Sequence, residues 1–448
     1  MIIKGMGASE IFSRFNLIFE REGIYLIYNS LSNSFVELDK ESYDLIRKLR
    51  PGDIADSLPD SLYEILKRIK GIVTDDSHEI DKIRYISLKN RYNTDRLILT
   101  LNPTTSCNFA CPYCFEYSHH GKTMTDEVEN KIIDFIKSQS GVKELNVTWF
   151  GGEPLLAFNR IESLTSKLLA LDLNYTAGII TNGYLMTKEI ACNLDRLKIS
   201  RVQITLDGPE DSHNRRRFLK NGGSTFKKII NSIDTLIKCA PTVKVLIRVN
   251  IDEENADAFL PLYDNLMERF EGKVSIYPAF TGDSTDKGTT CLFNKQQQQS
   301  FMFDIFQKRG LNLVGFYPTM FRSECAVRGQ RSYIIGPEGE LYSCWNNVGN
   351  PDKIYGFVDG KLTNEHELLK FKVTADALEN AECQKCLLYP VCSGGCPYER
   401  IKRYENGENP NDCPLIKLDI EGFLWNHYLY KTKNNKNVSE TDWPSDFF

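Results

Sequence analysis

The sequence lacks the long apolar segments that membrane insertion and secretion require. Its 448 residues contain no run of the roughly 18 apolar residues that a bilayer-spanning helix needs. Charged and polar side chains are scattered through the first 19 residues, so the apolar core of a signal peptide is missing as well. These absences predict a cytoplasmic protein without a membrane partner.

The sequence also lacks an excess of charge of one sign. Its 55 Lys and Arg residues nearly balance 60 Asp and Glu residues, which gives a net charge of −5. A surface that binds nucleic acid needs a basic excess to neutralise phosphates, so we expect no nucleic-acid partner. Internal repeats are absent too. The length and the 41% hydrophobic content are typical of a folded chain with two to four domains.

Cysteine, by contrast, is abundant, with 13 residues. In a large cytoplasmic chain, clustered cysteines bind metals more often than they form disulfides. Most of the cysteines here fall into tight groups along the sequence. Cys192, Cys239 and Cys291 stand apart from these groups, and we expect them to serve packing only.

Apolar runs of strand length alternate with amphipathic helical stretches in the middle of the chain. The predicted strands are Leu97–Leu101, Leu145–Phe150, Tyr175–Thr181, Arg201–Leu206, Val243–Ile251 and Val274–Tyr277. The helical stretches between them are Glu127–Lys137, Ile161–Leu169, Glu189–Leu194 and Phe226–Lys238. This alternation predicts an α/β fold with a parallel sheet, built as a partial (β/α)6 barrel. Its functional site is expected at the carboxyl ends of the strands.

A small α+β domain is predicted before the barrel, in residues 1–92. Gly23–Tyr28 and Phe35–Leu38 are predicted strands joined by a turn. Asp39 is a predicted N-cap for a helix that reaches Leu49, and a second helix follows near Asp60.

The region after the barrel is rich in glycine, proline and cysteine, with short strands at Ser332–Ile335 and Leu341–Cys344. We expect such a region to need metal for its stability. The polar residues at the C-terminus predict a tail. The predicted domains are 1–92, 93–315, 316–430 and the tail 431–448.

Three cysteines follow the first predicted barrel strand with the spacing Cys107-x3-Cys111-x2-Cys114. They therefore lie where this fold places its site. Three thiolates can ligate three irons of a 4Fe–4S cluster and leave the fourth iron open to a ligand. The alternative is a zinc site completed by His119 or His120, which fits the spacing less well.

The segment CNFACPYC, residues 107–114, resembles the cluster-binding loop of the radical SAM superfamily. In that superfamily the open iron binds S-adenosylmethionine (SAM), and one electron breaks a C–S bond of SAM to give a 5′-deoxyadenosyl radical. That radical abstracts hydrogen from a substrate. The resemblance implies SAM and a 4Fe–4S cluster as cofactors, with a reductant such as flavodoxin or ferredoxin as a partner.

Segments at the ends of later strands resemble the SAM-binding motifs of the same superfamily. Gly151–Pro154 resembles its GGEP motif, which holds the SAM amino group, and Thr181–Gly183 ends the next strand. Thr205–Pro209 resembles its SLDGP segment, with Thr in place of Ser. Arg215 and Arg216 leave the identity of the arginine that contacts SAM open by one or two positions.

The resemblance assigns a role to several of these side chains. The ring of Tyr113 would lie against the adenine, and the side chains of Thr205 and Arg217 would contact the ribose or the carboxylate. The implied SAM-binding residues are Tyr113, Gly151, Gly152, Glu153, Asn182, Thr205 and Arg217.

Seven further cysteines lie near the C-terminus, and their spacing resembles that of the SPASM domain of radical SAM enzymes. That domain carries two additional 4Fe–4S clusters, which would bring the total to three. The resemblance implies an outer cluster on Cys383, Cys386, Cys392 and Cys413, and an inner cluster on Cys325, Cys344 and Cys396. With only three ligands the inner cluster would have an open iron, unless Cys291 supplies a fourth.

SPASM-type enzymes mostly modify ribosomally made peptides, so the implied partner is a precursor peptide with a leader sequence. Residues 1–92 resemble the PqqD-like domain, which binds a leader by strand addition. The alternative is a domain that only caps the barrel. We therefore predict a radical SAM/SPASM maturase that forms a thioether or carbon–carbon cross-link in such a peptide.

Two other functions stay open. Anaerobic sulfatase-maturating enzymes share the triplet and the SPASM domain, but they use an Asp directly after the second SPASM cysteine as a proton acceptor. Here that position is Trp345, which cannot accept a proton. The other alternative is a non-catalytic iron–sulfur electron-transfer protein. Asp207 and Glu116 are candidate bases, and no catalytic residue is assigned.

Overall fold

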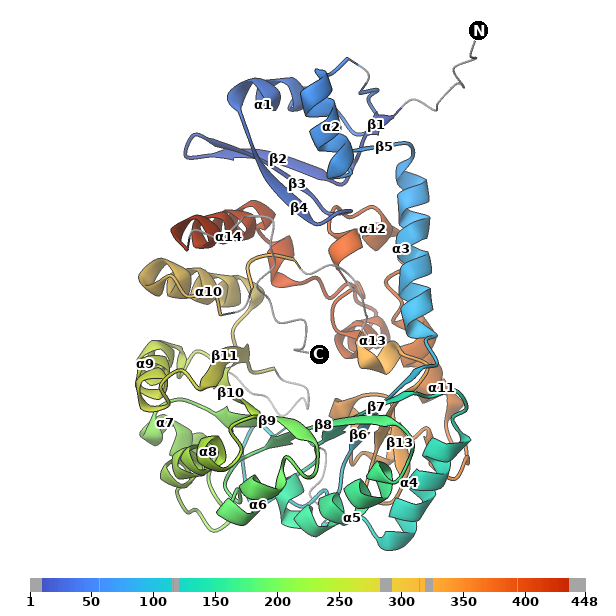
Figure 1. The fold of residues 1–448 in the computed structure, drawn as a ribbon, viewed down its shortest axis with the longest axis vertical. Helices are drawn as coiled ribbons and strands as arrows, with labels where there is room; N and C mark the ends of the chain where they lie inside the picture. The colour runs from blue at the N-terminus through green and yellow to red at the C-terminus, as the bar shows by residue number, and fades with distance from the viewer. Residues whose placement is uncertain are drawn as a thin grey trace. The chain divides into compact units, whose positions relative to one another are not determined.

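The computed structural model describes residues 10–55, 57–114, 116, 121–282, 292–313, 315–318, 325–392 and 394–434. They form two units (Figure 1). The barrel unit contains the described residues of 93–305 and 327–374, and the terminal unit contains those of 1–92, 306–326 and 375–448. Within the described residues, no helix has both the length and the apolar character needed to cross a bilayer.

A parallel sheet forms the centre of the barrel unit. Its strands are β6 (Arg96–Leu101), β7 (Glu144–Trp149), β8 (Asn174–Thr181), β9 (Ile199–Leu206), β10 (Lys244–Ile251) and β11 (Val274–Phe280), which pair in chain order. Each predicted barrel strand overlaps one of them, so the predicted α/β fold with a parallel sheet is confirmed. Val245, Ile247 and Val249 in β10 are buried, as the apolar run predicts.

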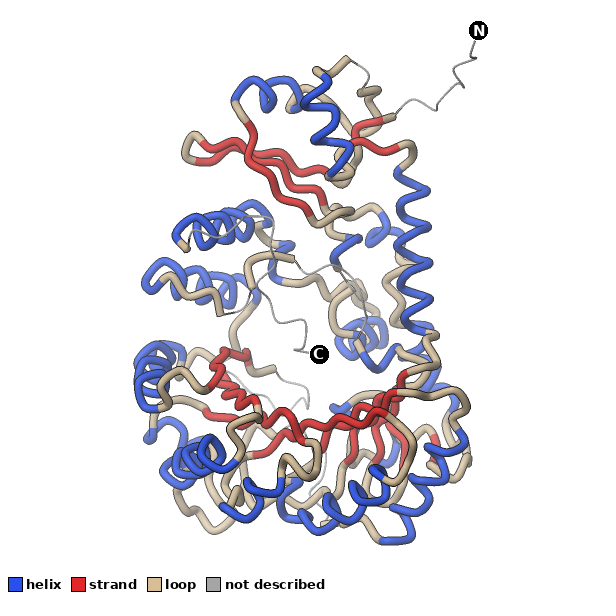
Figure 2. The backbone as a smooth tube through the Cα atoms, in the orientation of Figure 1, coloured by secondary structure: helices blue, strands red, loops and turns tan. Residues whose placement is uncertain are grey.

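Helices between these strands cover the outer side of the curved sheet (Figure 2). They are α4 (Asp126–Ser138), α5 (Phe158–Leu169), α6 (Lys188–Asn193), α7 (Glu210–Arg216), α8 (Phe226–Cys239) and α9 (Phe259–Arg269). Helix α8 buries Ile229, Ile233 and Leu236, a spacing that places the three side chains on one face. Thr125 caps α4 by accepting a hydrogen bond from the Val128 amide at 3.3 Å.

Three short strands extend the barrel sheet beyond β6. They are β12 (Ser332–Ile335), β13 (Glu340–Tyr342) and β14 (Gly356–Phe357). β12 runs parallel to β6, with Ser332 opposite Ile98, and β13 is antiparallel to β12. The sequence predicted short strands here, but only long-range pairing shows that they belong to the same sheet as the barrel strands.

A three-stranded antiparallel sheet organises the N-terminal part of the terminal unit. Its strands are β2 (Asn16–Arg21), β3 (Ile24–Asn29) and β4 (Ser34–Leu38), in that order. Alternate side chains of β3 face opposite ways. Ile27 packs with Ile46 and Leu62, whereas Leu26 packs with Leu424 and Trp425. The sheet is therefore covered on both faces, and β2 and β4 are its edges.

The remaining elements of the structure are mostly short. The other strands, β1 (Ile11–Phe12) and β5 (Ile72–Val73), pair with each other. The other helices are α1 (Lys40–Ile46), α2 (Asp60–Arg68), α3 (Asp76–Arg91), α10 (Lys295–Arg309), α11 (Glu365–Leu369), α12 (Ala381–Gln384), α13 (Pro397–Glu405) and α14 (Ile420–Lys433). Several single turns, such as Pro154–Ala157, Leu415–Lys417 and the π-turn Lys370–Thr374, complete the set.

The N-terminal prediction was incomplete. Asp39 caps α1 as predicted, accepting from the Ser42 amide at 2.8 Å, but the helix ends at Ile46. The sequence reasoning missed β2 and α3. Helix α3 exposes large apolar side chains such as Tyr85 and Leu88, which obscure the helical period. Helix α14 continues to Lys433, into the predicted tail, and residues 435–448 lie outside the described residues.

Candidate functional site

The cysteine triplet lies in the loop that follows β6, at the carboxyl end of the parallel sheet. Cys107, Cys111 and Cys114 are free and half-buried. Burial, together with Glu153 and the two other thiols, raises the pKa of Cys107 to about 12. Burial and the nearby Glu116 raise the pKa of Cys114 to about 11. The three thiols are thus close enough to oppose one another's ionisation.

This donor set fits an iron–sulfur cluster. Three adjacent half-buried thiols become thiolates together most readily when a cationic metal compensates their charge. Within the described part of the chain, no three His, Cys, Asp or Glu side chains are arranged to hold a single metal ion. His119 and His120, the zinc alternative, lie outside the described residues. Glu116 is buried beside the triplet, and burial with the charge of Glu153 raises its pKa to about 8.

Two glycines let the loop after β7 pack directly on the cysteine loop. The Gly152 amide donates to the Thr104 carbonyl at 3.2 Å, and the Glu153 amide donates to the Ser106 carbonyl at 2.8 Å. A Cβ atom on Gly152 would lie 2.3 Å from the Ser106 carbonyl oxygen. Gly151 has a φ of +121°, which side-chain-bearing residues rarely adopt. Both positions therefore need glycine.

Glu153 connects this loop to the next strand. Its fully buried carboxylate accepts from the Thr181 hydroxyl at 2.6 Å, from the Asn182 amide at 2.7 Å and from the Leu155 amide at 3.0 Å. Burial raises the pKa of Glu153, and these hydrogen bonds oppose the rise. The predicted residues Glu153 and Asn182 are therefore in direct contact.

Asn108 joins the same group from within the cysteine loop. The Asn182 side-chain amide donates to the Asn108 side-chain oxygen at 2.7 Å. The Asn108 side-chain nitrogen and the Asn102 side-chain oxygen are buried and have no hydrogen-bond partner among the described residues. Unpaired buried polar atoms are costly, so they indicate a place for a polar ligand.

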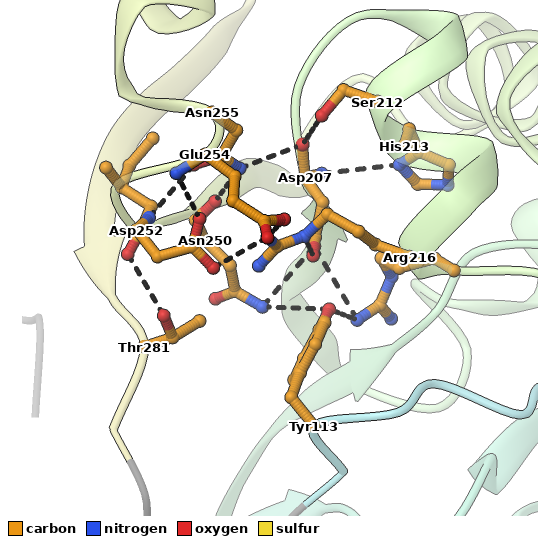
Figure 3. A network of polar contacts seen from close by, with 12 residues as sticks. Tyr113, Asp207, Ser212, His213, Arg216, Asn250, Asp252, Glu254, Asn255 and Thr281 are labelled. Atoms are coloured by element: carbon orange, nitrogen blue, oxygen red, sulfur yellow. Dashed lines mark hydrogen bonds and ion pairs between the residues drawn. The ribbon is translucent and has the colours of Figure 1, made fainter. Parts of the chain in front are cut away.

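The three arginines after β9 differ in their surroundings. These differences bear on which arginine contacts SAM, a question that the sequence left open. Arg215 is exposed. Arg216 is held by Asp207, at 2.9 Å from its Nε atom (Figure 3). Arg217 donates to the Tyr113 hydroxyl at 2.9 Å and lies over the Phe109 ring, and its buried Nε has no partner among the described residues. The Arg216 guanidinium also lies over the Tyr113 ring, at 5.2 Å, so Arg216 and Arg217 both face the cysteine loop. Arg217 differs from Arg216 in its buried Nε atom, which has no partner among the described residues.

A polar network around Asp207 fixes this arrangement (Figure 3). Asp207 is fully buried and pairs with Arg216, whose guanidinium also contacts Asp252 at 2.6 Å. Asn250 donates to the Asp207 carboxylate at 3.4 Å and to the Tyr113 hydroxyl at 3.3 Å. Asp207 therefore serves as the anchor of an ion pair. The predicted Thr205 is buried in β9, two residues before Asp207.

The four cysteines predicted for the outer cluster lie close together in the terminal unit. Cys383 and Cys392 each interact electrostatically with the other members of the set, and burial raises the pKa of both. The Gly394 amide donates to the Cys392 sulfur at 3.3 Å. Cys383, Cys386, Cys392 and Cys413 are therefore near enough to one another to interact electrostatically.

The cysteines predicted for the inner cluster divide between the two units. Cys325 and Cys396 belong to the terminal unit, where they interact electrostatically. Cys344 belongs to the barrel unit and follows β13. Cys291, the proposed fourth ligand, lies outside the described residues.

Sequence reasoning missed several residues of the site. Asn250 is the penultimate residue of β10, so its position near a strand end was a usable signal. Asn108 lies between the first two cysteines of the loop, but nothing in the sequence indicates its contact with Asn182. The cations beside the outer cysteines, Arg400 and Lys417, were also missed, because their proximity depends on tertiary structure.

Comparison with known proteins identifies sequence relatives. The radical SAM superfamily matches residues 101–266. A radical SAM cyclopropyl synthase of Paramaledivibacter caminithermalis is 24% identical over 91% of this chain and 94% of that protein. A serine-type anaerobic sulfatase-maturating enzyme of Bacteroides thetaiotaomicron is 26% identical over 67% of this chain and 82% of that protein.

Solved structures share the fold. The structure of anSMEcpe with bound AdoMet and the Cp18Cys peptide matches with a TM-score of 0.58 and 21% identity, over 76% of this chain and 99% of that chain. Streptococcus suis SuiB bound to the precursor peptide SuiA matches with a TM-score of 0.51 and 16% identity, over 90% and 98%. The superfamily match includes the cysteine loop and the strand ends that surround it, so the chain contains a radical SAM domain in residues 101–266 and is an enzyme.

Proposed function

We propose that this enzyme cleaves SAM reductively and uses the resulting 5′-deoxyadenosyl radical to modify a ribosomally synthesised peptide, with formation of a thioether or carbon–carbon cross-link. One observation carries the proposal: three free thiols, the Gly151–Glu153 loop and Arg217 meet at the carboxyl end of the parallel sheet. The alternative of a non-catalytic electron-transfer protein is wrong, since the chain is a radical SAM enzyme.

The residues of this site have distinct roles in the proposal. Cys107, Cys111 and Cys114 would hold a 4Fe–4S cluster, which supplies the electron for SAM cleavage when bound. The unpaired Nε of Arg217 offers a hydrogen bond to an oxygen of SAM. Arg217 and Asn250 fix the Tyr113 hydroxyl, so the ring is held in one orientation for stacking.

Two features support a peptide as the substrate. The solved structures of anSMEcpe and SuiB, which share the fold, contain bound peptides. The N-terminal sheet has two edge strands, β2 and β4, and an edge strand can pair with an extended leader segment. We therefore propose that a leader-bearing precursor peptide is the partner, that flavodoxin or ferredoxin is the reductant, and that the reaction takes place in the cytoplasm.

The proposal includes two further 4Fe–4S clusters. Cys383, Cys386, Cys392 and Cys413 would ligate the outer cluster, and the electrostatic contacts among their thiols support this assignment. The inner cluster would use Cys325, Cys344 and Cys396, with an open iron unless Cys291 contributes.

Formylglycine formation is the second candidate, because several curated relatives are anaerobic sulfatase-maturating enzymes. Trp345 argues against it. The Trp345 ring lies 5.0 Å from the Phe150 ring and is 37% exposed, so an aromatic surface occupies the position of the proton acceptor. Phe150 directly precedes Gly151, which places this surface beside the candidate SAM site.

A co-expression experiment tests the proposed function. We expect a short peptide encoded beside the gene of this enzyme to lose hydrogen mass when both are produced anaerobically. A peptide from a sulfatase, carrying Cys or Ser, is expected to stay unchanged. Mass spectrometry distinguishes the two outcomes. Formylglycine in the sulfatase peptide alone supports the second candidate, and two unchanged peptides despite complete SAM cleavage contradict both.

Replacing Arg217 with Ala is expected to weaken SAM binding by about 10-fold to 100-fold, since a hydrogen bond from a charged group contributes about 1.5–3 kcal/mol. Arg215→Ala is the matched control, because Arg215 is exposed, and its SAM affinity should stay within about twofold of the wild type. Equilibrium dialysis on cluster-loaded protein gives the two dissociation constants. Equal SAM affinities for the two variants would show that Arg217 does not contribute to SAM binding.

A further inference from the structure

A lysine contacts the proposed outer-cluster ligands directly. Lys417 Nζ lies 3.0 Å from the Cys386 sulfur. The side chain comes from the single turn Leu415–Lys417, which begins two residues after Cys413. Its charge also acts on Cys392 and Cys413. Lys417 therefore acts on three of the four thiols rather than on one.

A second cation lies on the buried side of the same set. Arg400, in α13, is 3% exposed, and its guanidinium and the Cys383 sulfur both contact the Asn411 side-chain oxygen, at 3.2 Å and 3.4 Å. Its guanidinium is held in place because it donates to the carbonyls of Ala375 at 3.1 Å and Gly394 at 3.3 Å, and to the Asn411 side chain at 3.2 Å. This arginine cannot turn away from the cysteines without losing those bonds.

Among the described residues, neither the exposed Lys417 nor the buried Arg400 forms an ion pair with a carboxylate. A buried charge such as that of Arg400 is usually paired. The Lys417 ammonium instead contacts the Cys386 sulfur, and the charge of Arg400 acts on Cys383. A pairing of this kind is favourable only when the thiols carry negative charge, as they do when they ligate a cluster.

We propose that Lys417 and Arg400 raise the reduction potential of the outer cluster; the inference rests on the proposed function, which makes Cys383, Cys386, Cys392 and Cys413 its ligands. A cluster with four thiolates is negatively charged, and one-electron reduction adds to that charge. A cation at hydrogen-bonding distance stabilises the reduced form more than the oxidised form. Hydrogen bonds to ligand sulfurs act in the same direction.

The test is a redox titration of the full-length chain in which Cys107, Cys111 and Cys114 are replaced by Ala. Two reductive steps are expected with dithionite, one for each C-terminal cluster. We expect Lys417→Gln to shift one step to lower potential. At a fixed potential the ratio of reduced to oxidised cluster should fall about tenfold, which corresponds to a shift of about 59 mV for a one-electron couple. The other step serves as an internal reference. Lys417→Arg, which keeps the charge, should leave the potential of the affected step close to the value with Lys417.

Lys385→Gln is the matched control. Lys385 is exposed and precedes Cys386 in sequence, so the change removes the same charge without removing a contact to sulfur. An equal shift in this variant, or no shift in both Lys417→Gln and Lys417→Met at full iron content, overturns the inference. If the chain with the three Cys→Ala changes and an unchanged Lys417 shows only one reductive step and lacks the iron of one cluster, the outer cluster itself is contradicted. Iron analysis distinguishes that result from failure of the inference about Lys417.

Discussion

Simultaneous replacement of Cys107, Cys111 and Cys114 with Ala is expected to abolish the release of 5′-deoxyadenosine from SAM. These residues are the only thiols in the loop that joins β6 to the candidate SAM site, so the variant cannot ligate a cluster there. The C-terminal cysteines are untouched. Iron should therefore fall from about twelve to about eight atoms per chain, as expected for the loss of one cluster of four irons.

The measurement is anaerobic reconstitution followed by incubation with SAM and dithionite, with nucleoside products separated by chromatography. Cys192→Ala is the control, because Cys192 is a solvent-exposed cysteine outside the proposed ligand sets. Its iron content and product yield should equal those of the wild type. Product release by the triple variant at the wild-type rate would show that the triplet is not the radical-forming site.

Replacing Gly152 with Ala is expected to lower SAM cleavage by at least about tenfold. The new Cβ atom would lie 2.3 Å from the Ser106 carbonyl oxygen and 2.6 Å from that of Thr105. Both contacts are with backbone, which cannot turn aside as a flexible side chain can. Overpacking of this kind costs about 1–3 kcal/mol. The strain falls on the residues directly before Cys107, so the iron content should fall together with the rate of SAM cleavage.

Gly282→Ala provides the comparison for this variant, since no atom of the described residues lies within 4 Å of a Cβ atom at that position. Product yield, iron content and the thermal unfolding midpoint should be measured for both variants. Retention of wild-type yield and iron by Gly152→Ala would mean that the two loops are not packed as described.

The sequence predicted those parts of the molecule in which local pattern decides the structure. The apolar runs of β6 to β11 predicted the parallel sheet, and the position of the triplet directly after the first predicted strand placed it at the carboxyl end of that sheet. Asp39 was a reliable capping signal because its contact with Ser42 is local. In each case the interacting residues are near in sequence, or the pattern repeats along the element.

Long-range contacts were not predictable in the same way. No local pattern indicates that Ser332 pairs with Ile98, because that register depends on a chain segment more than two hundred residues away. The choice among Arg215, Arg216 and Arg217 likewise needed the positions of Asp207 and Tyr113. Helix α3 was missed because its exposed apolar residues hide the period on which the prediction depends.

The pairing of β12 with β6 also has a consequence for biosynthesis. An open parallel sheet presents unpaired backbone groups at its edges, and such edges associate with other chains. During translation β6 is made early, whereas Ser332–Ile335 leaves the ribosome only after the rest of the parallel sheet. The nascent chain therefore carries an uncovered edge for most of its synthesis. Truncated chains that end before β12 would keep that edge permanently and are expected to aggregate.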